Sequence, residues 1–326
     1  MKVCFHIGYP RTGTTFLQAN IFPFHSEINY LGPKYHYYGD QPEVKVYLNK
    51  EILKKITNSF QYDDVFKLKI SEITDKMKDI LDTTQFDEKK LNLISTEKYL
   101  TYGYKSFKEI YLIKKYLDAV IKNVDFKIFF MVRNQYDIIF SQFHHGHFLL
   151  GKQLGITKFK ELIYSINDIN KSKKETLEFF KLYDYFKIFD ELKKIFGKEN
   201  IEILEYENFK NDPQDFFLNL SKIFEIDSSE TKILSGRNKL NFLNVSDKNQ
   251  ILVENSITIF LGNLFKKMGI KKFIPKFLKE KIKTLLFSKI ALREYNQDEL
   301  RSIVENYYKN SNINFKKETG VKFLST

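Results

Sequence analysis

The feature that most constrains the fold of this chain is a short apolar run that ends in a glycine-bounded loop and continues into an amphipathic helix pattern. The run begins at Val3, the loop lies between Gly8 and Gly13, and Thr14 and Thr15 open the helix pattern. Free backbone N–H groups at such a helix start favour an anion, as does the helix dipole. The two glycines let successive amides curl toward one phosphate. This order predicts a phosphate-binding turn.

The loop departs at one position from the P-loop of proteins that bind nucleoside triphosphates. Its glycine spacing is nearly that of G-x-x-x-x-G-K-[ST], but Thr14 stands at the lysine position and the nearest cation is Arg11, inside the loop. A P-loop kinase or NTPase is therefore one candidate class for this chain. Against it, none of the expected strands ends in a clear Asp for Mg²⁺.

Strand and helix patterns alternate along the chain, which predicts an α/β fold with a P-loop-like central parallel sheet flanked by helices. The expected strands are Lys2–Gly8, Leu91–Glu97, Phe126–Arg133 and Ile201–Glu207. The expected helices are Thr14–Ile21, Val65–Leu81, Ser106–Lys122, Gln135–Phe148, Lys173–Phe196 and Pro213–Phe224. Asn211 and Asp212 are cap candidates for the last of these, and Gly197 is a helix stop.

No repeat, linker or low-complexity tract divides the chain, so we expect one domain over residues 1–326. Residues 35–90 and 150–200 are expected to be helical insertions, and residues 250–326 a helical C-terminal region. The single cysteine, Cys4, excludes an internal disulfide. With no visible signal peptide and no apolar run of about 18 residues, a cytoplasmic location is the simplest expectation.

The formal net charge of +12 indicates an anionic partner or a general lysine bias of the composition. Much of the charge lies in the amphipathic segment Leu264–Phe287, which contains Pro275. Such a segment is typical of a helix that contacts a membrane surface, and equally of a peripheral helix with a solvated lysine face. A non-catalytic nucleic-acid or membrane binder is a further alternative, although we expect no nucleic-acid partner.

A second anion signal follows the third expected strand. Arg133 stands at the carboxyl end of that strand, where ligands of open α/β sheets gather. Asn134 and Asp137 resemble a helix-capping pair, and Ser141 lies about two turns further on. Arginine suits phosphate because its planar fork donates in pairs. Alternatively, Arg133 pairs with Asp137 and Ser141 is a small buried residue.

Together the two signals resemble the sulfotransferases that use 3′-phosphoadenylyl sulfate (PAPS). In that family the motif P-[KR]-[ST]-G-T-[TS], here Pro10-Arg11-Thr12-Gly13-Thr14-Thr15, holds the 5′-phosphosulfate. A strand-end Arg with a Ser eight residues later, here Arg133 and Ser141, binds the 3′-phosphate. The stretch Ile203–Phe209 with Asn211–Pro213 is similar to one found in bacterial members. The resemblance implies PAPS as the sulfuryl donor and no required metal.

Sulfuryl transfer needs cations and N–H donors at the leaving phosphate and a base for the acceptor proton. The resemblance implies that Arg11 stabilises the transferring group, although Arg cannot donate a proton as the lysine of many members can. Glu97 is the favoured base, because carbohydrate-modifying members carry a Glu there. The rival candidates for the base are His144, His145 and His147. For these histidines, a role in the acceptor pocket or in packing is favoured over metal binding.

The acceptor is the least determined part of the predicted reaction. A saccharide is the first expectation, resting on the resemblance at Glu97, while a phenol or a lipid headgroup stays open. The aromatic cluster Tyr35–Tyr38 is a candidate pocket wall. The stretch Ser235–Lys239 has the composition of the basic-glycine segment that closes over the 3′-phosphate in the family.

Overall fold

The computed structural model describes residues 1–32, 50–60, 63–96, 107–144, 156–168, 172–237, 250–254, 287–291 and 297–322. The chain divides into two compact units. The first consists of Met1–Ile138, Glu178–Asn241 and Tyr308–Thr326, and the second of Ile139–Leu177 and Phe242–Tyr307. The expectation of one domain over residues 1–326, with its insertions, stays a prediction.

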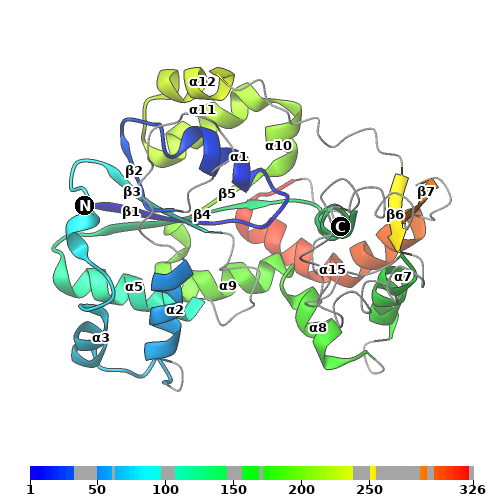
Figure 1. The fold of residues 1–326 in the computed structure, drawn as a ribbon, viewed down its shortest axis with the longest axis horizontal. Coiled ribbons are helices and arrows are strands. Elements are labelled where there is room, and N and C mark those ends of the chain that lie inside the picture. Colours follow the sequence, from blue (N-terminus) through cyan, green and yellow to red (C-terminus); the bar gives the residue numbers. More distant parts are fainter. Residues whose placement is uncertain are drawn as a thin grey trace, which may run out of the picture. The chain divides into compact units, whose positions relative to one another are not determined.

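The first unit is built on a five-stranded sheet in the order β2-β3-β1-β4-β5, in which every pairing is parallel (Figure 1). The strands are β1 Lys2–Ile7, β2 Ile28–Tyr30, β3 Leu91–Thr96, β4 Asp125–Val132 and β5 Ile201–Glu205. The expected α/β class with a P-loop-like parallel sheet is confirmed. The short edge strand β2 was not expected, since three residues carry too little pattern to be recognised.

Helices cover both faces of this sheet, which explains the continuous apolar run of β4. Figure 1 shows α1, α10, α11 and α12 on one face and α5 and α9 on the other. Their bounds are α1 Thr14–Phe16, α5 Phe107–Val120, α9 Tyr185–Phe196, α10 Tyr206–Asn211, α11 Pro213–Phe224 and α12 Ser228–Arg237. Outside α5 pack α2 (Lys50–Ser59) and α3 (Ile70–Met77). In β4, residues Ile128–Val132 are fully buried.

Several helix ends follow from local side-chain chemistry. Helix α11 has the expected bounds, with Pro213 in its first turn and the Asp212 side chain accepting a hydrogen bond from the Asp215 N–H at 3.0 Å. Gly197, with φ of 81°, ends α9 as expected. Helix α6 (Gln135–His144) begins after Asn134, whose Oδ1 accepts from the N–H groups of Tyr136 and Asp137 at 3.0 and 3.3 Å.

Three of the expected helices differ from the structure. The helix expected over Lys173–Phe196 is two helices, α8 (Lys174–Lys181) and α9, because Asp184 caps a new helix by accepting from the Lys187 N–H at 3.2 Å. The helix expected over Thr14–Ile21 starts as α1 and continues as the π-helix η1 (Leu17–Ile21). The expected helix at Val65–Leu81 is shorter, with α3 over Ile70–Met77.

The last expected strand, Ile201–Glu207, ends two residues early. Glu205 pairs with Val132, the final residue of β4, so no partner backbone continues the ladder. The chain therefore turns into the short helix α10 at Tyr206. Glu207 therefore lies in helix α10 and not in the sheet.

The second unit contains helices and two paired strands. Helix α7 (Ile156–Tyr164), the turn η4 (Ser165–Asn167) and the first part of α15 (Gln297–Thr319) belong to it. Phe143 of α6 stacks on Phe159 of α7 at 4.1 Å between ring centroids. Strands β6 (Gln250–Glu254) and β7 (Phe287–Ala291) pair antiparallel, so the expected helical region 250–326 also includes strand.

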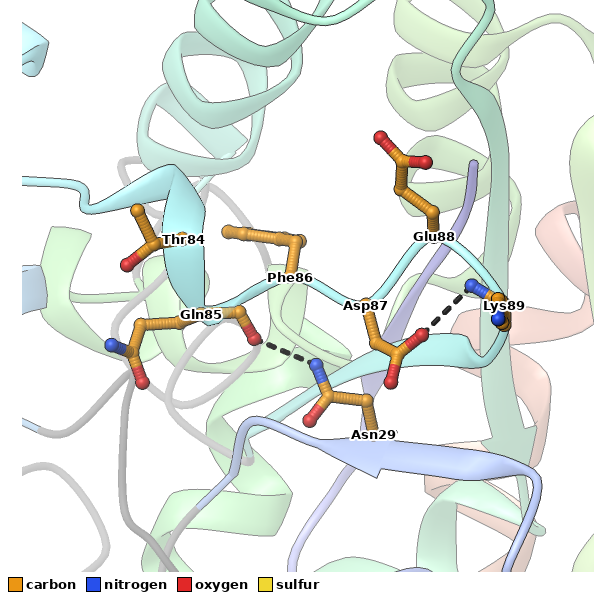
Figure 2. Close-up of a pocket in the computed structure, with 7 residues that line it drawn as sticks. All are labelled: Asn29, Thr84, Gln85, Phe86, Asp87, Glu88 and Lys89. Atoms are coloured by element: carbon orange, nitrogen blue, oxygen red, sulfur yellow. Dashed lines mark hydrogen bonds between the residues drawn. The ribbon is translucent and has the colours of Figure 1, made fainter.

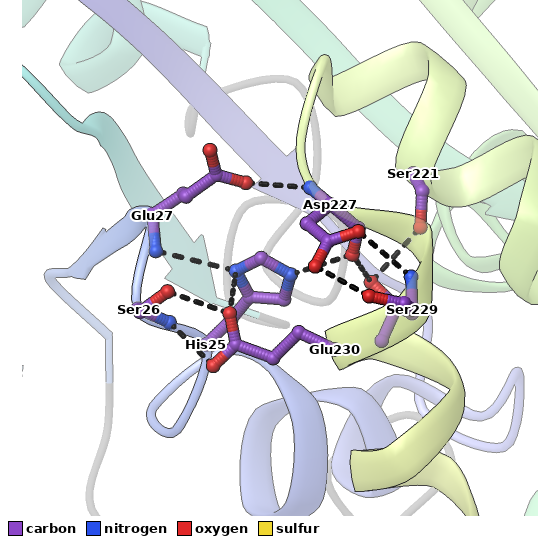
Figure 3. A network of polar contacts seen from close by, with 8 residues as sticks. His25, Ser26, Glu27, Ser221, Asp227, Ser229 and Glu230 are labelled. Carbon is purple, nitrogen blue, oxygen red and sulfur yellow. Dashed lines mark hydrogen bonds and ion pairs between the residues drawn. The ribbon is translucent and has the colours of Figure 1, made fainter.

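A network of polar side chains joins the turn before β2 to the turn between α11 and α12 (Figure 3). The buried His25 contacts the Asp227 carbonyl oxygen through Nε2 at 3.1 Å, and its Nδ1 accepts from the Glu27 N–H at 3.3 Å. Ser26 Oγ donates to Glu230 at 2.6 Å, and the Asp227 N–H donates to Glu27 at 2.5 Å. The network closes the fold between segments about 200 residues apart.

Within the described part of the chain, every helix is too short or too polar to span a bilayer.

Candidate active site

The glycine-bounded loop and Arg133 meet at the point where the strand order of the sheet reverses. Strand β1 lies between β3 and β4, and the chain continues from β1 toward β2 and β3 on one side and from β4 toward β5 on the other. The carboxyl ends of β1 and β4 therefore flank a topological switch point, the usual ligand position in open α/β sheets. Residues 8–13 follow β1, and Arg133 follows β4.

The loop is shaped from within by two buried threonines. Thr12 Oγ1 donates to the Tyr9 carbonyl oxygen at 2.8 Å, and Thr14 Oγ1 donates to the same oxygen at 3.2 Å. A Cβ on Gly8 would collide with the Thr14 side chain, and Gly13 adopts φ of 80° against Phe209. The hydroxyls of Thr12 and Thr14 are therefore engaged within the loop, while Thr15, the second residue of α1, is exposed.

Arg11 lies at the crest of the loop in a backbone conformation that is rare for a residue with a side chain. Its φ is 73°, in the left-handed region, and such a conformation persists only where neighbours impose it. One neighbour is Arg133, whose Nη1 donates to the Arg11 carbonyl oxygen at 2.8 Å. The two expected anion-binding arginines are thus in direct contact.

Arg133 is held on its backbone and on its side chain. The Tyr185 hydroxyl donates to the Arg133 carbonyl oxygen at 2.6 Å and accepts from the Arg133 N–H at 3.3 Å. The guanidinium stands over the ring of Tyr206, with Cζ 4.6 Å from the ring centroid. The half-buried Arg133 is therefore fixed before any ligand arrives.

The break between α8 and α9 supports the loop as well as Arg133. Tyr9 donates from its hydroxyl to the Leu182 carbonyl oxygen at 2.5 Å and stacks on Tyr183 at 5.6 Å between centroids. Tyr185 meets the Tyr9 ring edge-on at 5.6 Å. A continuous helix would have used the Leu182 carbonyl in its own ladder, so the break frees that oxygen to bind the loop.

Glu207 is an acid in the neighbourhood of Arg133. Burial is the main cause that raises the pKa of Glu207 to about 7. Its own backbone N–H and the charge of Arg133 lower the pKa, whereas Asp137 and Glu205 raise it. Both protonation states are therefore populated near neutral pH.

His6, in contrast, is a packed residue of β1. Its Nδ1 lies 2.7 Å from Ser95 Oγ, and its ring stacks on Phe129. Burial lowers the pKa of His6 to about 3, so the ring is neutral.

Most other predicted site residues lie in the second unit or outside the described residues. Ser141 is half-buried on α6 and belongs to the second unit. Glu97, His145, His147, Tyr35–Tyr38 and residues 264–286 lie outside the described residues, as does the side chain of His144. Ser235–Arg237 end α12, and Asn238 and Lys239 lie beyond the description.

Sequence reasoning missed four residues around the arginine pair. They are Tyr9, Tyr185, Tyr206 and Glu207. Asp184 as a helix cap between two tyrosines was a signal for the helix break. No comparable signal marked Glu207, because its burial depends on Arg133 and on the neighbouring strand.

A separate hollow of about 510 Å³ lies at the opposite end of the strands (Figure 2). Residues 84–89, which precede β3, and Asn29 line it, and Asn29 Nδ2 donates to the Gln85 carbonyl oxygen at 2.8 Å. It opens at the amino end of β3, away from the phosphate loop.

A family model described as "Sulfotransferase domain" matches residues 4–289. The chain belongs to this sulfotransferase domain family, as its sequence predicted. The match spans β1, the loop and the strand end at Arg133.

Solved structures with similar folds include several sulfotransferases. A sulfotransferase from Alicyclobacillus acidocaldarius is 17% identical, with a TM-score of 0.41, covering 69% of this chain and 81% of that one. Mouse sulfotransferase SULT7A1 complexed with PAP is 15% identical, with a TM-score of 0.33 and coverages of 72% and 62%. Retinol dehydratase in a complex with retinol and PAP is 14% identical, with a TM-score of 0.39 and coverages of 98% and 83%. A comparison with curated proteins found no match.

Proposed function

We propose that this sulfotransferase moves a sulfuryl group from PAPS to a hydroxyl or amine of a saccharide or other small acceptor. The observation that carries the proposal is the contact between Arg133 Nη1 and the Arg11 carbonyl oxygen at the sheet switch point. This contact brings the guanidinium of Arg133 to the backbone of the glycine-bounded loop, at the carboxyl ends of β1 and β4. A nucleotide with separate 5′ and 3′ anionic groups matches such an arrangement better than a single phosphate does.

In this proposal Arg11 and the amides of residues 12–15 hold the 5′-phosphosulfate. The positive charge of Arg11 stabilises the negative charge that develops on the leaving phosphate oxygen as the S–O bond breaks. Arg133 holds the 3′-phosphate, with Ser141 as a second donor. The fork of Arg133 retains donors for an anion beyond the one that binds the Arg11 carbonyl.

Glu97 is proposed to accept the acceptor's proton as the new S–O or S–N bond forms. Its support is the family resemblance and its position one residue after β3, which ends at Thr96 beside the Ile7 end of β1. The saccharide acceptor rests on the same resemblance. No residue of the proposed reaction requires a metal.

Binding and transfer assays test the proposal. We expect calorimetry to detect tight binding of 3′,5′-diphosphoadenosine (PAP) and a labelled-PAPS assay to detect transfer to a panel of sugars, phenols and lipid headgroups. Binding of ATP with Mg²⁺ while PAP is ignored would contradict the proposal and favour a kinase. A response to nucleic acid or anionic vesicles alone, steeply dependent on salt, would favour a non-catalytic binder.

The two arginines predict different losses. Arg11→Ala should lower transfer by at least about 100-fold with a smaller effect on PAP affinity, because charge at the reacting group acts mainly in the transition state. Arg133→Ala should weaken PAP binding by about 10- to 100-fold. Glu97→Gln should slow transfer while leaving the Kd for PAP unchanged. Equal losses of PAP affinity in the Arg11 and Arg133 variants would contradict these separate roles.

A further inference from the structure

The start of α10 places an acid beside the guanidinium that the proposed reaction uses for the 3′-phosphate. Glu207 is the second residue of α10, and Arg133 acts on it electrostatically from the end of β4. Its Oε2 is buried and has no hydrogen-bond partner among the residues that the structure describes. An oxygen of this kind is costly when charged, so its place next to an anion site calls for an explanation.

We propose that Glu207 is a positioning residue for Arg133 and takes up one proton when a phosphate group binds at Arg133. The proposal rests on the proposed function, because the phosphate in question is the 3′-phosphate of PAPS or PAP.

The charges that surround Glu207 make the ionised form unfavourable once a phosphate arrives. Three charged residues of the described structure act on Glu207. They are the cation Arg133, which follows β4, and the acids Asp137 of α6 and Glu205 of β5. Glu205 Oε1 accepts from the Lys322 N–H at 2.7 Å. Helix α11, which packs on α10, brings the acids Asp212 and Asp215 at its near end. A bound phosphate would add up to two negative charges to this set.

Arg133 is the cation for which the carboxylate and the phosphate compete. Its Nη1 is already engaged with the Arg11 carbonyl oxygen, and its face is stacked on Tyr206. Protonating Glu207 leaves the charge of Arg133 to the phosphate, and the neutral carboxyl can remain buried. Without ligand, the ionised carboxylate offsets the arginine charge instead. The proton comes from solvent and no bond other than the carboxyl O–H changes.

The sign of the pH dependence follows from this exchange. In the ligand-free protein the pKa of Glu207 is about 7, so its carboxyl group is mostly ionised above that pH. Phosphate binding there requires the uptake of a proton, and the affinity for PAP therefore falls as pH rises. Ionisation of the ligand acts in the opposite direction, because a phosphate monoester has its second pKa near 6. That effect is nearly complete at pH 7.5, so the two contributions separate in pH.

Calorimetric titration of PAP into the full-length protein tests the inference. Between pH 7 and 8.5 we expect the Kd of the wild type to rise about tenfold, and that of Glu207→Gln, which mimics the neutral acid, to change less than twofold. Near pH 6 the two proteins should bind PAP equally. Glu199→Gln is the matched control, because Glu199 is exposed in the turn η5 (Lys198–Asn200), which precedes β5, the strand that leads into α10. This variant should behave as the wild type.

A measurement on the wild type alone keeps the test valid if Glu207→Gln does not fold. At pH 8, titrations in two buffers of different ionisation enthalpy should give an uptake of about half a proton or more per PAP bound. An uptake of zero overturns the inference, as does the same pH dependence in Glu207→Gln and wild type. Either result leaves PAP binding intact. Failure of the wild type to bind PAP at any pH overturns the proposed function and the inference with it.

Discussion

At the scale of the residue, Tyr185 shows how one hydroxyl positions the backbone of Arg133. It both donates to and accepts from the backbone of Arg133, so the strand end cannot shift without breaking two hydrogen bonds. The hydroxyl is buried, and burial together with its surroundings raises the pKa of Tyr185 well above its usual value. It is therefore a neutral donor at every physiological pH.

Removing this hydroxyl should loosen Arg133 without removing its charge. Tyr185→Phe leaves a buried N–H and carbonyl unpaired, and we expect the free energy of unfolding to fall by about 1–3 kcal/mol. The Kd for PAP should rise about 3- to 10-fold because the arginine is no longer held in place. Urea unfolding and calorimetry measure the two effects. Tyr116→Phe on α5 is the control, and an equal loss of PAP affinity there would contradict a specific role for Tyr185.

At the scale of the element, the shape of the glycine-bounded loop depends on the absence of a side chain at Gly8. Thr14 occupies the space where a Cβ of residue 8 would stand, and from there it reaches the Tyr9 carbonyl oxygen. The helix break at residues 182–184 holds the other side of the same turn through Tyr9. Loop, helix start and break therefore form one supported structure.

Gly8→Ala should disrupt this unit. The added methyl group displaces Thr14, and we expect a loss of about 1–3 kcal/mol in unfolding free energy, as for other overpacked sites, together with loss of PAP binding. Gly236→Ala on α12 is the matched control, because nothing lies within 4 Å of a Cβ there. That change should be neutral or stabilise by up to about 1 kcal/mol. Unaltered PAP affinity in Gly8→Ala would show that the loop adapts.

At the scale of the whole molecule, closure of the first unit depends on contacts between distant segments. His25 is buried between the turn before β2 and the turn before α12, where its Nδ1 accepts a backbone N–H and its Nε2 contacts the Asp227 carbonyl oxygen (Figure 3). This joins the edge of the sheet bearing β2 to the helices that cover it.

His25→Ala should weaken the global fold more than the site. Loss of the ring leaves a cavity and unpaired backbone groups, so we expect about 2–4 kcal/mol less unfolding free energy. Chemical denaturation measures this loss, and the Kd for PAP should stay within about twofold of the wild type. Ser229→Ala, at an exposed residue of the same network, should cost less than about 1 kcal/mol. A loss as small for His25 would contradict its role in closure.

How far the sequence led can be followed in single elements. The apolar run of β4 and the Asp212–Pro213 start of α11 were predictable because each follows from local pattern and capping. The strand end at Glu205 was not, since it depends on where β4 stops. The break at Asp184 had a local capping signal, but the contact of Leu182 with Tyr9 depends on tertiary structure. Glu97 and Ser141 remain predictions as site residues.

The sequence by itself determined the α/β class, the glycine-bounded loop and the membership in the sulfotransferase domain family, because these depend on local order and spacing. Only the tertiary structure decided that Arg133 binds the Arg11 carbonyl and that Glu207 Oε2 is buried where the charge of Arg133 acts on the carboxyl group. Those relations join the ends of three strands, and the two arginines alone are 122 residues apart in the chain. Parallel pairing brings the strand ends together, and local sequence carries no record of that neighbourhood.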